Sequence, residues 1–211
     1  MDRTGAPSPT PPDDKAGWRR VGMSARRQAA RTGIDPRDGS VAEVRDAART
    51  RAALDALTEF ATVCLYLSRT AEPDTTELAR RLFQRGTKVL VPVLTDGRGH
   101  GLGRPAWAWY NPAALREGLW GIPEPTTPVL PAEAIALAEV VVCSALWVDR
   151  RGWRVGVGGG WYDRVLGLRD GRARVWALVG DCEVVESLPH DPWDLRVDAV
   201  LTETGLHPLG S

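Results

Sequence analysis

One glycine-rich segment, from Arg154 to Arg164, holds most of the residues in this chain whose types and spacing could do chemistry. Gly158, Gly159 and Gly160 lack Cβ atoms, so the backbone there can take positive φ and approach a ligand closely. Successive N–H groups in such a loop form an anion-binding nest. A helix starting directly after the loop would add partial positive charge at the same place. The segment therefore predicts a phosphate-binding loop.

Charged residues bracket this loop. Arg154 and Arg164 supply two guanidinium groups, whose planar donors suit phosphate oxygens. Asp163 falls in the first turn of the predicted helix, where a carboxylate can hold a cation that bridges phosphates. The nest, the arginines and the carboxylate together indicate a MgATP site. The alternative is a glycine-rich surface turn in which Asp163 only caps a helix.

Two familiar phosphate-binding patterns do not fit the segment. A P-loop ends in Gly-Lys-Ser/Thr, whereas this run ends in Gly160 and Trp161. A dinucleotide fingerprint starting at Gly156 would need glycine or alanine at position 161. It would also belong to a first βα unit, and this segment lies late in the chain.

The composition limits the class of protein. A length of 211 residues suits one α/β domain. Lys plus Arg and Asp plus Glu both total 27, which gives no electrostatic footprint for nucleic acid or an anionic membrane. No apolar run approaches the roughly 20 residues of a membrane span, and the polar, Pro-rich N-terminus does not resemble a secretory signal. We expect a cytoplasmic protein without nucleic-acid or membrane partners.

The three cysteines, Cys64, Cys143 and Cys182, lie in apolar, strand-like stretches. Their odd number and wide spacing argue against a disulfide framework and a zinc site. They are interpreted as buried thiols in a reducing compartment. The three histidines show no ligand spacing, and no role is assigned to them.

The helices that must position the loop have local start and stop signals. Residues 1–12 are expected to be a disordered tail, residues 13–205 the α/β domain, and residues 206–211 a C-terminal tail. Asp13 or Asp14 can cap a first helix, and Ser40 and Glu43 have capping-box spacing for a second. Further helices are expected over 75–86, 131–137 and 161–168.

Short apolar runs between these helices predict strands buried on both faces. The runs are 62–67, 89–94, 140–148, 175–179 and 197–201. The glycine- and proline-rich stretch 95–130 has weak periodicity, and only a short strand over 107–110 is expected there. Strands that alternate with helices indicate a single α/β domain with a mixed, mostly parallel sheet flanked by helices.

The segment from Leu146 to Arg164 resembles the signature of the 5-formyltetrahydrofolate cyclo-ligase family: an apolar run, Asp, a turn Gly, Arg, then Gly-x-Gly-Tyr-Tyr-Asp. Four further segments resemble family motifs in the same order along the chain, namely 15–19, 67–75, 118–125 and 194–203. The likeness spans about residues 15–203. It implies a cyclo-ligase-like fold, related to the NagB/RpiA/CoA-transferase-like architecture.

The resemblance implies an ATP-dependent ligase of folate and one-carbon metabolism. In that family 5-formyltetrahydrofolate and ATP give 5,10-methenyltetrahydrofolate, ADP and phosphate. ATP phosphorylates the formyl oxygen, N10 attacks the activated carbon, and phosphate leaves. Such chemistry asks mainly for positioning and charge neutralisation.

The resemblance also assigns roles. It implies that Arg154, Tyr162 and Asp163 are catalytic, and that Asp163 and Asp194 hold Mg²⁺. The residues expected to bind ATP are Lys15, Arg19, Arg154, Gly156, Val157, Gly158, Gly159, Gly160, Trp161 and Tyr162. The residues expected to bind the folate are Arg19, Leu67, Glu72, Val157, Gly158, Gly159, Gly160 and Trp161. A carboxylate at Glu72 could accept paired N–H donors from a pterin edge.

The chain departs from the family pattern near the second substrate. Trp161 replaces a tyrosine, Val157 a tyrosine or arginine, Trp193 a histidine, Trp18 a leucine and Ser144 a proline. These changes leave the phosphate machinery whole. The leading hypothesis is a monomeric cyclo-ligase. The alternatives are a paralogue that uses MgATP to activate a different amide or carboxylate, and a non-catalytic nucleotide-binding protein.

Overall fold

The computed structural model describes residues 12–210. The tail expected over residues 1–12 therefore lies outside the described residues, apart from Pro12. The three cysteines carry free thiols, as expected. Cys64 and Cys143 are buried, as predicted, whereas Cys182 is only half-buried and lies in a 3₁₀ turn over Asp181–Glu183 instead of a strand.

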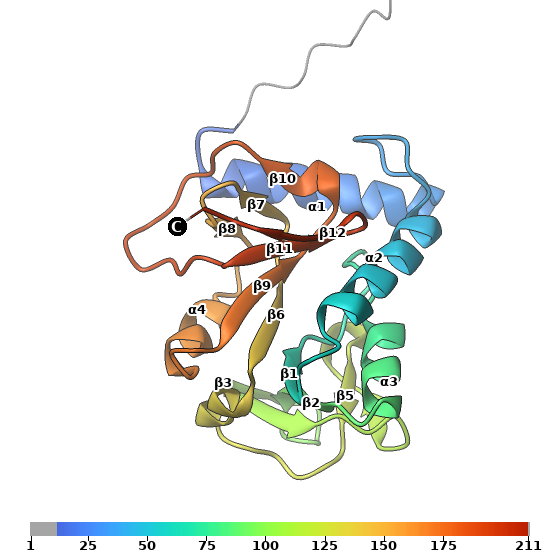
Figure 1. Ribbon diagram of the computed structural model, residues 1–211, viewed down its shortest axis with the longest axis vertical. Coiled ribbons are helices and arrows are strands. Elements are labelled where there is room, and N and C mark those ends of the chain that lie inside the picture. The colour runs from blue at the N-terminus through green and yellow to red at the C-terminus, as the bar shows by residue number, and fades with distance from the viewer. Residues whose placement is uncertain (1–11, 211) are drawn as a thin grey trace, which may run out of the picture.

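A seven-stranded sheet in the order β12-β11-β9-β6-β1-β2-β3 forms the centre of the fold (Figure 1). Its five inner strands, from β11 to β2, are parallel, whereas β3 and β12 are antiparallel edge strands. The strands of this sheet are β1 (Thr62–Leu65), β2 (Lys88–Thr95), β3 (Gly101–Trp109), β6 (Val140–Ser144), β9 (Arg174–Leu178), β11 (Ala199–Thr202) and β12 (Gly205–Pro208). This arrangement confirms the predicted single α/β domain with a mixed, mostly parallel sheet.

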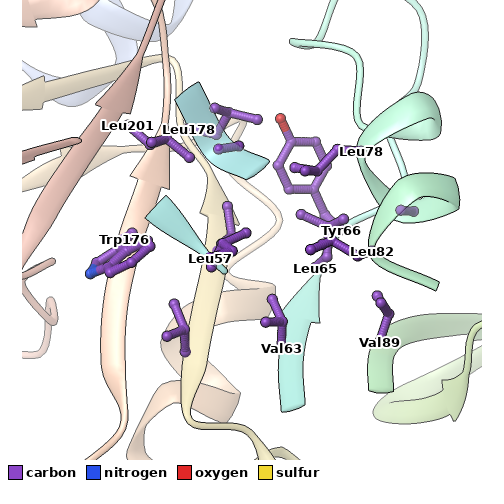
Figure 2. Close-up of a cluster of buried hydrophobic side chains, with 14 of the residues drawn as sticks. Leu57, Val63, Leu65, Tyr66, Leu78, Leu82, Val89, Trp176, Leu178 and Leu201 are labelled. Atoms are coloured by element: carbon purple, nitrogen blue, oxygen red, sulfur yellow. The ribbon is translucent and has the colours of Figure 1, made fainter. Parts of the chain in front are cut away.

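Alternating side chains of the parallel strands supply both layers of the core, because successive Cβ atoms point to opposite faces of a sheet. Val63 and Leu65 of β1 face α2 (Ala42–Ala56) and α3 (Thr76–Gln84), and Leu57, Leu78 and others complete this cluster (Figure 2). Burying each such side chain contributes about 1.5–3 kcal/mol.

The opposite face is covered by α4 (Trp161–Val165) and by 3₁₀ turns over Ala132–Leu137 and Leu166–Leu168. Cys64 of β1 and Val141 and Cys143 of β6 point to this side and pack around Trp107 of β3. The helices expected over 131–137 and 161–168 are thus present as 3₁₀ turns and one short α-helix.

The strand expected over 140–148 is broken. It forms β6 up to Ser144 and then leaves the main sheet as β7 (Trp147–Asp149), which pairs with β8 (Arg154–Val155) and β10 (Val184–Val185) in a three-stranded sheet. The long first helix, α1 (Lys15–Thr32), lies on this small sheet (Figure 1). Both halves of the apolar run are buried, so its hydrophobicity gave no signal of the break.

Trp147 of β7 joins α1 to the small sheet through a hydrogen bond and a ring contact. Its indole Nε1 donates to the carbonyl of Trp18 at 2.9 Å, and the two rings pack edge to face with centroids 5.1 Å apart. A Cβ added at Gly22 would lie 2.6 Å from that Nε1 and 3.2 Å from the Cβ of Leu146. Glycine at position 22 therefore allows the helix to approach the buried tryptophan.

We expect Gly22→Ala to lower the free energy of unfolding by about 1–3 kcal/mol, because neither buried neighbour can move without repacking. Urea denaturation measures the loss. Gly167→Ala is the control, since a Cβ there meets nothing within 4 Å. Equal stability of the two variants would contradict the close packing of α1.

The stretch over 95–130 contains more structure than predicted. β3 begins at Gly101, well before the expected strand, and a hairpin of β4 (Leu115–Glu117) and β5 (Pro123–Pro125) follows. Glu124, in the buried middle of this hairpin, accepts hydrogen bonds from the N–H groups of Leu94 and Thr95 and from Arg116. These long-range partners, rather than a local period, hold the hairpin on the end of β2.

Two boundary predictions were wrong. Residues 206–208 are not a tail, because β12 pairs with β11 along the edge of the main sheet. The capping box of the second helix does not form either, since Val41 occupies the cap of α2 without a side-chain bond. The Ser40 hydroxyl instead donates to Asp38 at 2.6 Å and accepts from Arg45 at 2.8 Å.

Candidate active site

The first turn of α1 brings two cationic side chains to the glycine-rich loop. Asp14 caps this helix by accepting the Gly17 N–H at 2.7 Å, as its sequence position predicted. Lys15 and Arg19 are four residues apart and share one helix face. The Arg19 Nε donates to the carbonyl of Gly156 at 3.2 Å.

The glycine loop needs glycine at two of its three consecutive positions. Gly158 has φ 104° and Gly160, the residue before α4, has φ 58°. Gly159 has an ordinary φ and open space around its Cβ position. The backbone requirement predicted for all three therefore applies to Gly158 and Gly160 only.

We expect Gly158→Ala to weaken nucleotide binding about tenfold, because a side chain at this left-handed φ costs on the order of 1–2 kcal/mol and shifts the loop. Titration with a non-hydrolysable ATP analogue measures the change. Gly159→Ala is the matched variant, since the free loop accepts its Cβ without strain. A larger loss at Gly159 than at Gly158 would mean that the ligand, and not the backbone, excludes the side chain.

Arg154 is positioned by a buried turn between β7 and β8. The carboxylate of Asp149, which is fully buried, accepts the N–H groups of Arg151, Trp153 and Leu188 at 2.9–3.0 Å. A Cβ at Gly152 would lie 2.4 Å from the carbonyl oxygen of Val197, so this position in the turn requires glycine. Asp149 of the signature segment thus has a structural role here.

Arg154 forms an ion pair with Asp163 across the glycine loop. Its side chain is 5% exposed, and its Nη1 donates to the carbonyl of Leu195 at 2.5 Å. Asp163 is 37% exposed, and only its Oδ1 takes part in this ion pair. Two of the three predicted catalytic residues are therefore in direct contact.

Lys15 forms a second ion pair, with the carboxylates of Asp194 and Asp191. Burial lowers the pKa of Lys15, but hydrogen bonds to the two aspartates outweigh it and raise the pKa. Burial likewise raises the pKa of Asp194, and the bonds from Lys15 and from the Asp191 N–H reverse this and lower it. Asp191 was not selected from the sequence, because an acid at the start of a Pro-containing turn carries no distinctive signal.

Two of the predicted folate-contacting residues, Leu67 and Glu72, lie on the loop after β1. Leu67 is only 6% exposed and belongs to the core cluster of Figure 2. Glu72 accepts the Arg69 N–H at 3.1 Å and pairs with the Arg69 side chain at 3.4 Å. The residue before it, Ala71, has φ 71°, an uncommon value for a non-glycine residue.

Tyr162 follows the glycine loop as the second residue of α4 and packs against both core clusters of the main sheet. Its hydroxyl is buried and has no hydrogen-bond partner among residues 12–210. Burial first, and then nearby groups that include Cys64, Tyr66 and Glu72, raise the pKa of Tyr162 well above its ordinary value. Tyr162 therefore stays neutral, and its hydroxyl is a buried donor with no acceptor in the described part of the chain.

The positions at which the chain departs from the family pattern lie in different surroundings. Trp161 packs edge to face against Trp107, with ring centroids 4.6 Å apart, so much of its ring is used inside the protein. Val157 is 39% exposed on the loop and Trp193 is 71% exposed on the turn after Asp191. Stacking of Trp161 on a ligand remains a prediction.

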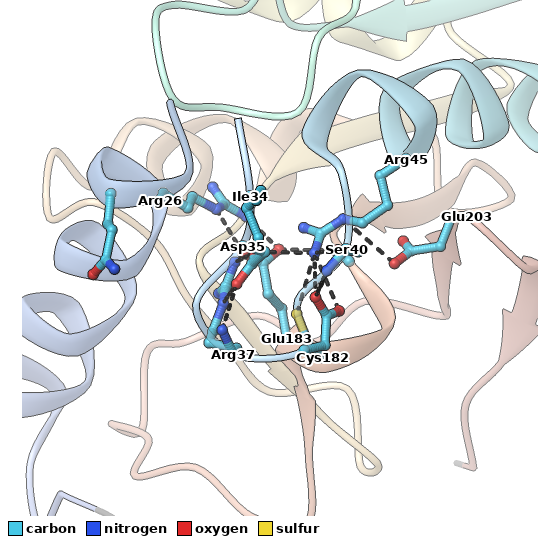
Figure 3. A network of polar contacts seen from close by, with 12 residues as sticks. Arg26, Ile34, Asp35, Arg37, Ser40, Arg45, Cys182, Glu183 and Glu203 are labelled. Carbon is cyan, nitrogen blue, oxygen red and sulfur yellow. Dashed lines mark hydrogen bonds and ion pairs between the residues drawn. The ribbon is translucent and has the colours of Figure 1, made fainter. Parts of the chain in front are cut away.

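Two sets of side chains carry atoms of the kind that bind cations. Asp163 and Asp194 fit Mg²⁺ by donor type, and each is held beside a basic side chain of the glycine-loop region. Asp35, Asp38 and Cys182 also have ligand spacing. The Arg45 Nη1, however, lies 2.9, 3.3 and 3.6 Å from their acceptor atoms and already supplies the positive charge (Figure 3).

The fold is that of an α/β enzyme built on a mostly parallel sheet, and the glycine loop with its ion pairs is its candidate active site. The chain belongs to the 5-formyltetrahydrofolate cyclo-ligase family, whose sequence model matches residues 13–203. This likeness confirms the family inferred from the sequence motifs.

Named relatives agree with this assignment. The 5-formyltetrahydrofolate cyclo-ligase of Mycolicibacterium smegmatis is 40% identical over 142 residues, which is 67% of this chain and 73% of that protein. The Escherichia coli K12 cyclo-ligase is 32% identical over 143 residues, 67% of this chain and 77% of that protein. No helix within residues 12–210 is long and apolar enough to cross a membrane.

Solved structures share the fold. The 5,10-methenyltetrahydrofolate synthetase of Aquifex aeolicus aligns with a TM-score of 0.66 at 23% identity, over 90% of this chain and 94% of that one. The enzyme of the same name from Mycoplasma pneumoniae gives 0.64 at 15% identity, over 90% and 99% of the two chains.

Proposed function

We propose that this protein is a 5-formyltetrahydrofolate cyclo-ligase that uses MgATP to close its substrate into 5,10-methenyltetrahydrofolate. Family membership supports the substrate. One structural observation supports the nucleotide: Arg154 pairs with Asp163, and Lys15 pairs with Asp194 and Asp191, beside a glycine loop. Such a site holds the charges that phosphates and a divalent cation would require.

On this proposal Lys15, Arg19 and Arg154 neutralise the phosphates, and the N–H groups of residues 156–160 bind their oxygens. Asp163 and Asp194 would hold Mg²⁺, which supplies charge neutralisation at the transferring phosphoryl group. The formyl oxygen takes the γ-phosphoryl group and ADP leaves. N10 then bonds to the formyl carbon and loses its proton, and phosphate leaves with the oxygen.

The ion pairs have a consequence for binding. Arg154 and Lys15 can bind phosphates only if they leave Asp163 and Asp194. These two carboxylates then need another cation. Nucleotide without Mg²⁺ would leave two carboxylates facing phosphate oxygens, and like charges at such distances repel. The nucleotide and the cation are therefore expected to bind together.

The folate side of the site is assigned to Leu67, Glu72 and the wall formed by Val157 and Trp161. The Tyr162 hydroxyl supports this assignment, because a buried donor without a protein partner is costly unless a ligand accepts from it. Substrate bound between Glu72 and the glycine loop would supply that acceptor.

An absorbance assay for methenyltetrahydrofolate tests the proposal. Purified protein is mixed with 5-formyltetrahydrofolate, with and without MgATP, and with ATP plus a chelator. Product should form only when both nucleotide and Mg²⁺ are present. Protein that binds MgATP but yields no methenyl product would refute the proposed activity.

A paralogue with a different substrate is the second candidate, and the tryptophan at position 161 favours it. If Val157 and Trp161 contact folate, Trp161→Tyr restores the family residue, and turnover of 5-formyltetrahydrofolate is kept or raised. If they contact another amide or carboxylate, the same change lowers the activity on that substrate. A non-catalytic protein would show nucleotide binding without turnover in either variant.

A further inference from the structure

We infer that Asp191 is a positioning residue that holds the Lys15 ammonium in place for the nucleotide phosphates. The inference rests on the proposed function and concerns a residue to which neither the motifs nor the family likeness gave a role.

The contacts single out Asp191 within its turn. The Asp194 N–H donates to the Asp191 carbonyl at 3.1 Å, and the Asp191 N–H donates to the Asp194 Oδ2 at 2.7 Å. The turn is thus closed by the backbone of Asp191 and not by its carboxylate. That carboxylate accepts from Lys15 Nζ at 2.7 Å, its one hydrogen bond among residues 12–210.

The two carboxylates on Lys15 differ in their surroundings. Asp194 has a side chain only 9% exposed and accepts from both Lys15 and the Asp191 N–H. Asp191 has a side chain that is 44% exposed. One ammonium therefore faces two carboxylates, one more than its own charge can balance.

The Asp191 carboxylate is needed when nucleotide binds. Asp194 then turns to the cation, and Lys15 loses one of its two acceptors. Lys15 lies in the first turn of α1 on a flexible four-carbon stem, whose freezing costs rotamer entropy. The remaining bond to Asp191 keeps the ammonium in place, so this entropy is lost on folding and not on binding.

A double-mutant cycle tests this role. The variants are Asp191→Asn, Lys15→Met and their combination, each titrated with a non-hydrolysable ATP analogue and Mg²⁺ and assayed for methenyl product. Asp191→Asn keeps the backbone turn and removes only the charge. We expect it to weaken analogue binding and raise KM for MgATP about three- to tenfold with kcat nearly unchanged, and Asp191→Glu to restore part of the loss.

The cycle separates positioning from a structural effect, since coupled residues give non-additive changes. In the Lys15→Met background, Asp191→Asn should cause no further change. Asp170→Asn, on an exposed ion pair with Arg172, is the control and should leave KM at the wild-type value. A wild-type KM for Asp191→Asn would overturn the inference, and so would an equal loss of analogue affinity with and without Lys15. In either case an active wild-type protein leaves the proposed function standing. Wild-type protein that binds no nucleotide would end both.

Discussion

Asp163→Asn is expected to lower turnover by on the order of 100- to 1,000-fold, a loss typical of removing one charge-stabilising group from a phosphoryl-transfer site. The carboxylate has two functions on the proposed mechanism. It pairs with the guanidinium of Arg154 in the free protein, and with nucleotide bound it would hold the cation that neutralises the phosphates. Asparagine keeps the shape but loses the charge needed for both.

The fold should survive this change, because Arg154 keeps its bond to the carbonyl of Leu195 and Asp163 itself is partly exposed. Steady-state assays over a range of Mg²⁺ concentrations, together with thermal unfolding, measure the two effects. Asp170→Asn serves as the control. Turnover at the wild-type rate at ordinary Mg²⁺ concentrations would remove Asp163 from the site.

Glu183→Gln is expected to have the largest effect on stability, a loss of about 3–5 kcal/mol. The Glu183 side chain is 1% exposed, and its two oxygens accept from Arg26 and Arg37 at 2.7 Å and from the Gly180 N–H at 2.8 Å (Figure 3). Glutamine would leave a buried guanidinium without its counter-charge. Because Arg26 belongs to α1, the change also loosens the helix that carries Lys15.

Chemical denaturation of the variant gives the stability difference directly. Glu77→Gln is the matched control, since Glu77 also pairs with two arginines, Arg80 and Arg81, but on an exposed face of α3. Its removal should change stability little, as is usual for surface ion pairs. Similar losses in the two variants would contradict the importance of burial.

The same carboxylate predicts an acid-sensitive fold. Burial raises the pKa of Glu183, but the charges and hydrogen bonds of Arg26 and Arg37 outweigh it and lower the pKa from 4.5 to about 2. A lowered folded-state pKa gives stability that is present above 4.5 and is lost as the pH falls toward 2. Denaturation midpoints at pH 5 and at about pH 3 should therefore differ more in the wild type than in Glu183→Gln.

Much of the fold and part of the site could be predicted from local patterns. Short apolar runs bounded by turn residues gave the five parallel strands, because a strand buried on both faces has no polar side. A helix cap was expected at Asp13 or Asp14 and is formed by Asp14, and the glycine run was expected as a loop with left-handed residues. These features depend on neighbours within a few positions along the chain.

The tertiary structure decided what the sequence could not. Lys15 meets Asp191 and Asp194 across 176 and 179 positions, and Arg26 meets Glu183 across 157. The break after Ser144 is equally non-local, since both halves of that apolar run are buried, in two different sheets. A single sequence specifies which residues avoid water and how the backbone turns, but a charged side chain acquires its partner only when the packed sheet and α1 bring distant segments together. The glycine loop could therefore be predicted from the sequence, whereas the ion pairs beside it could not.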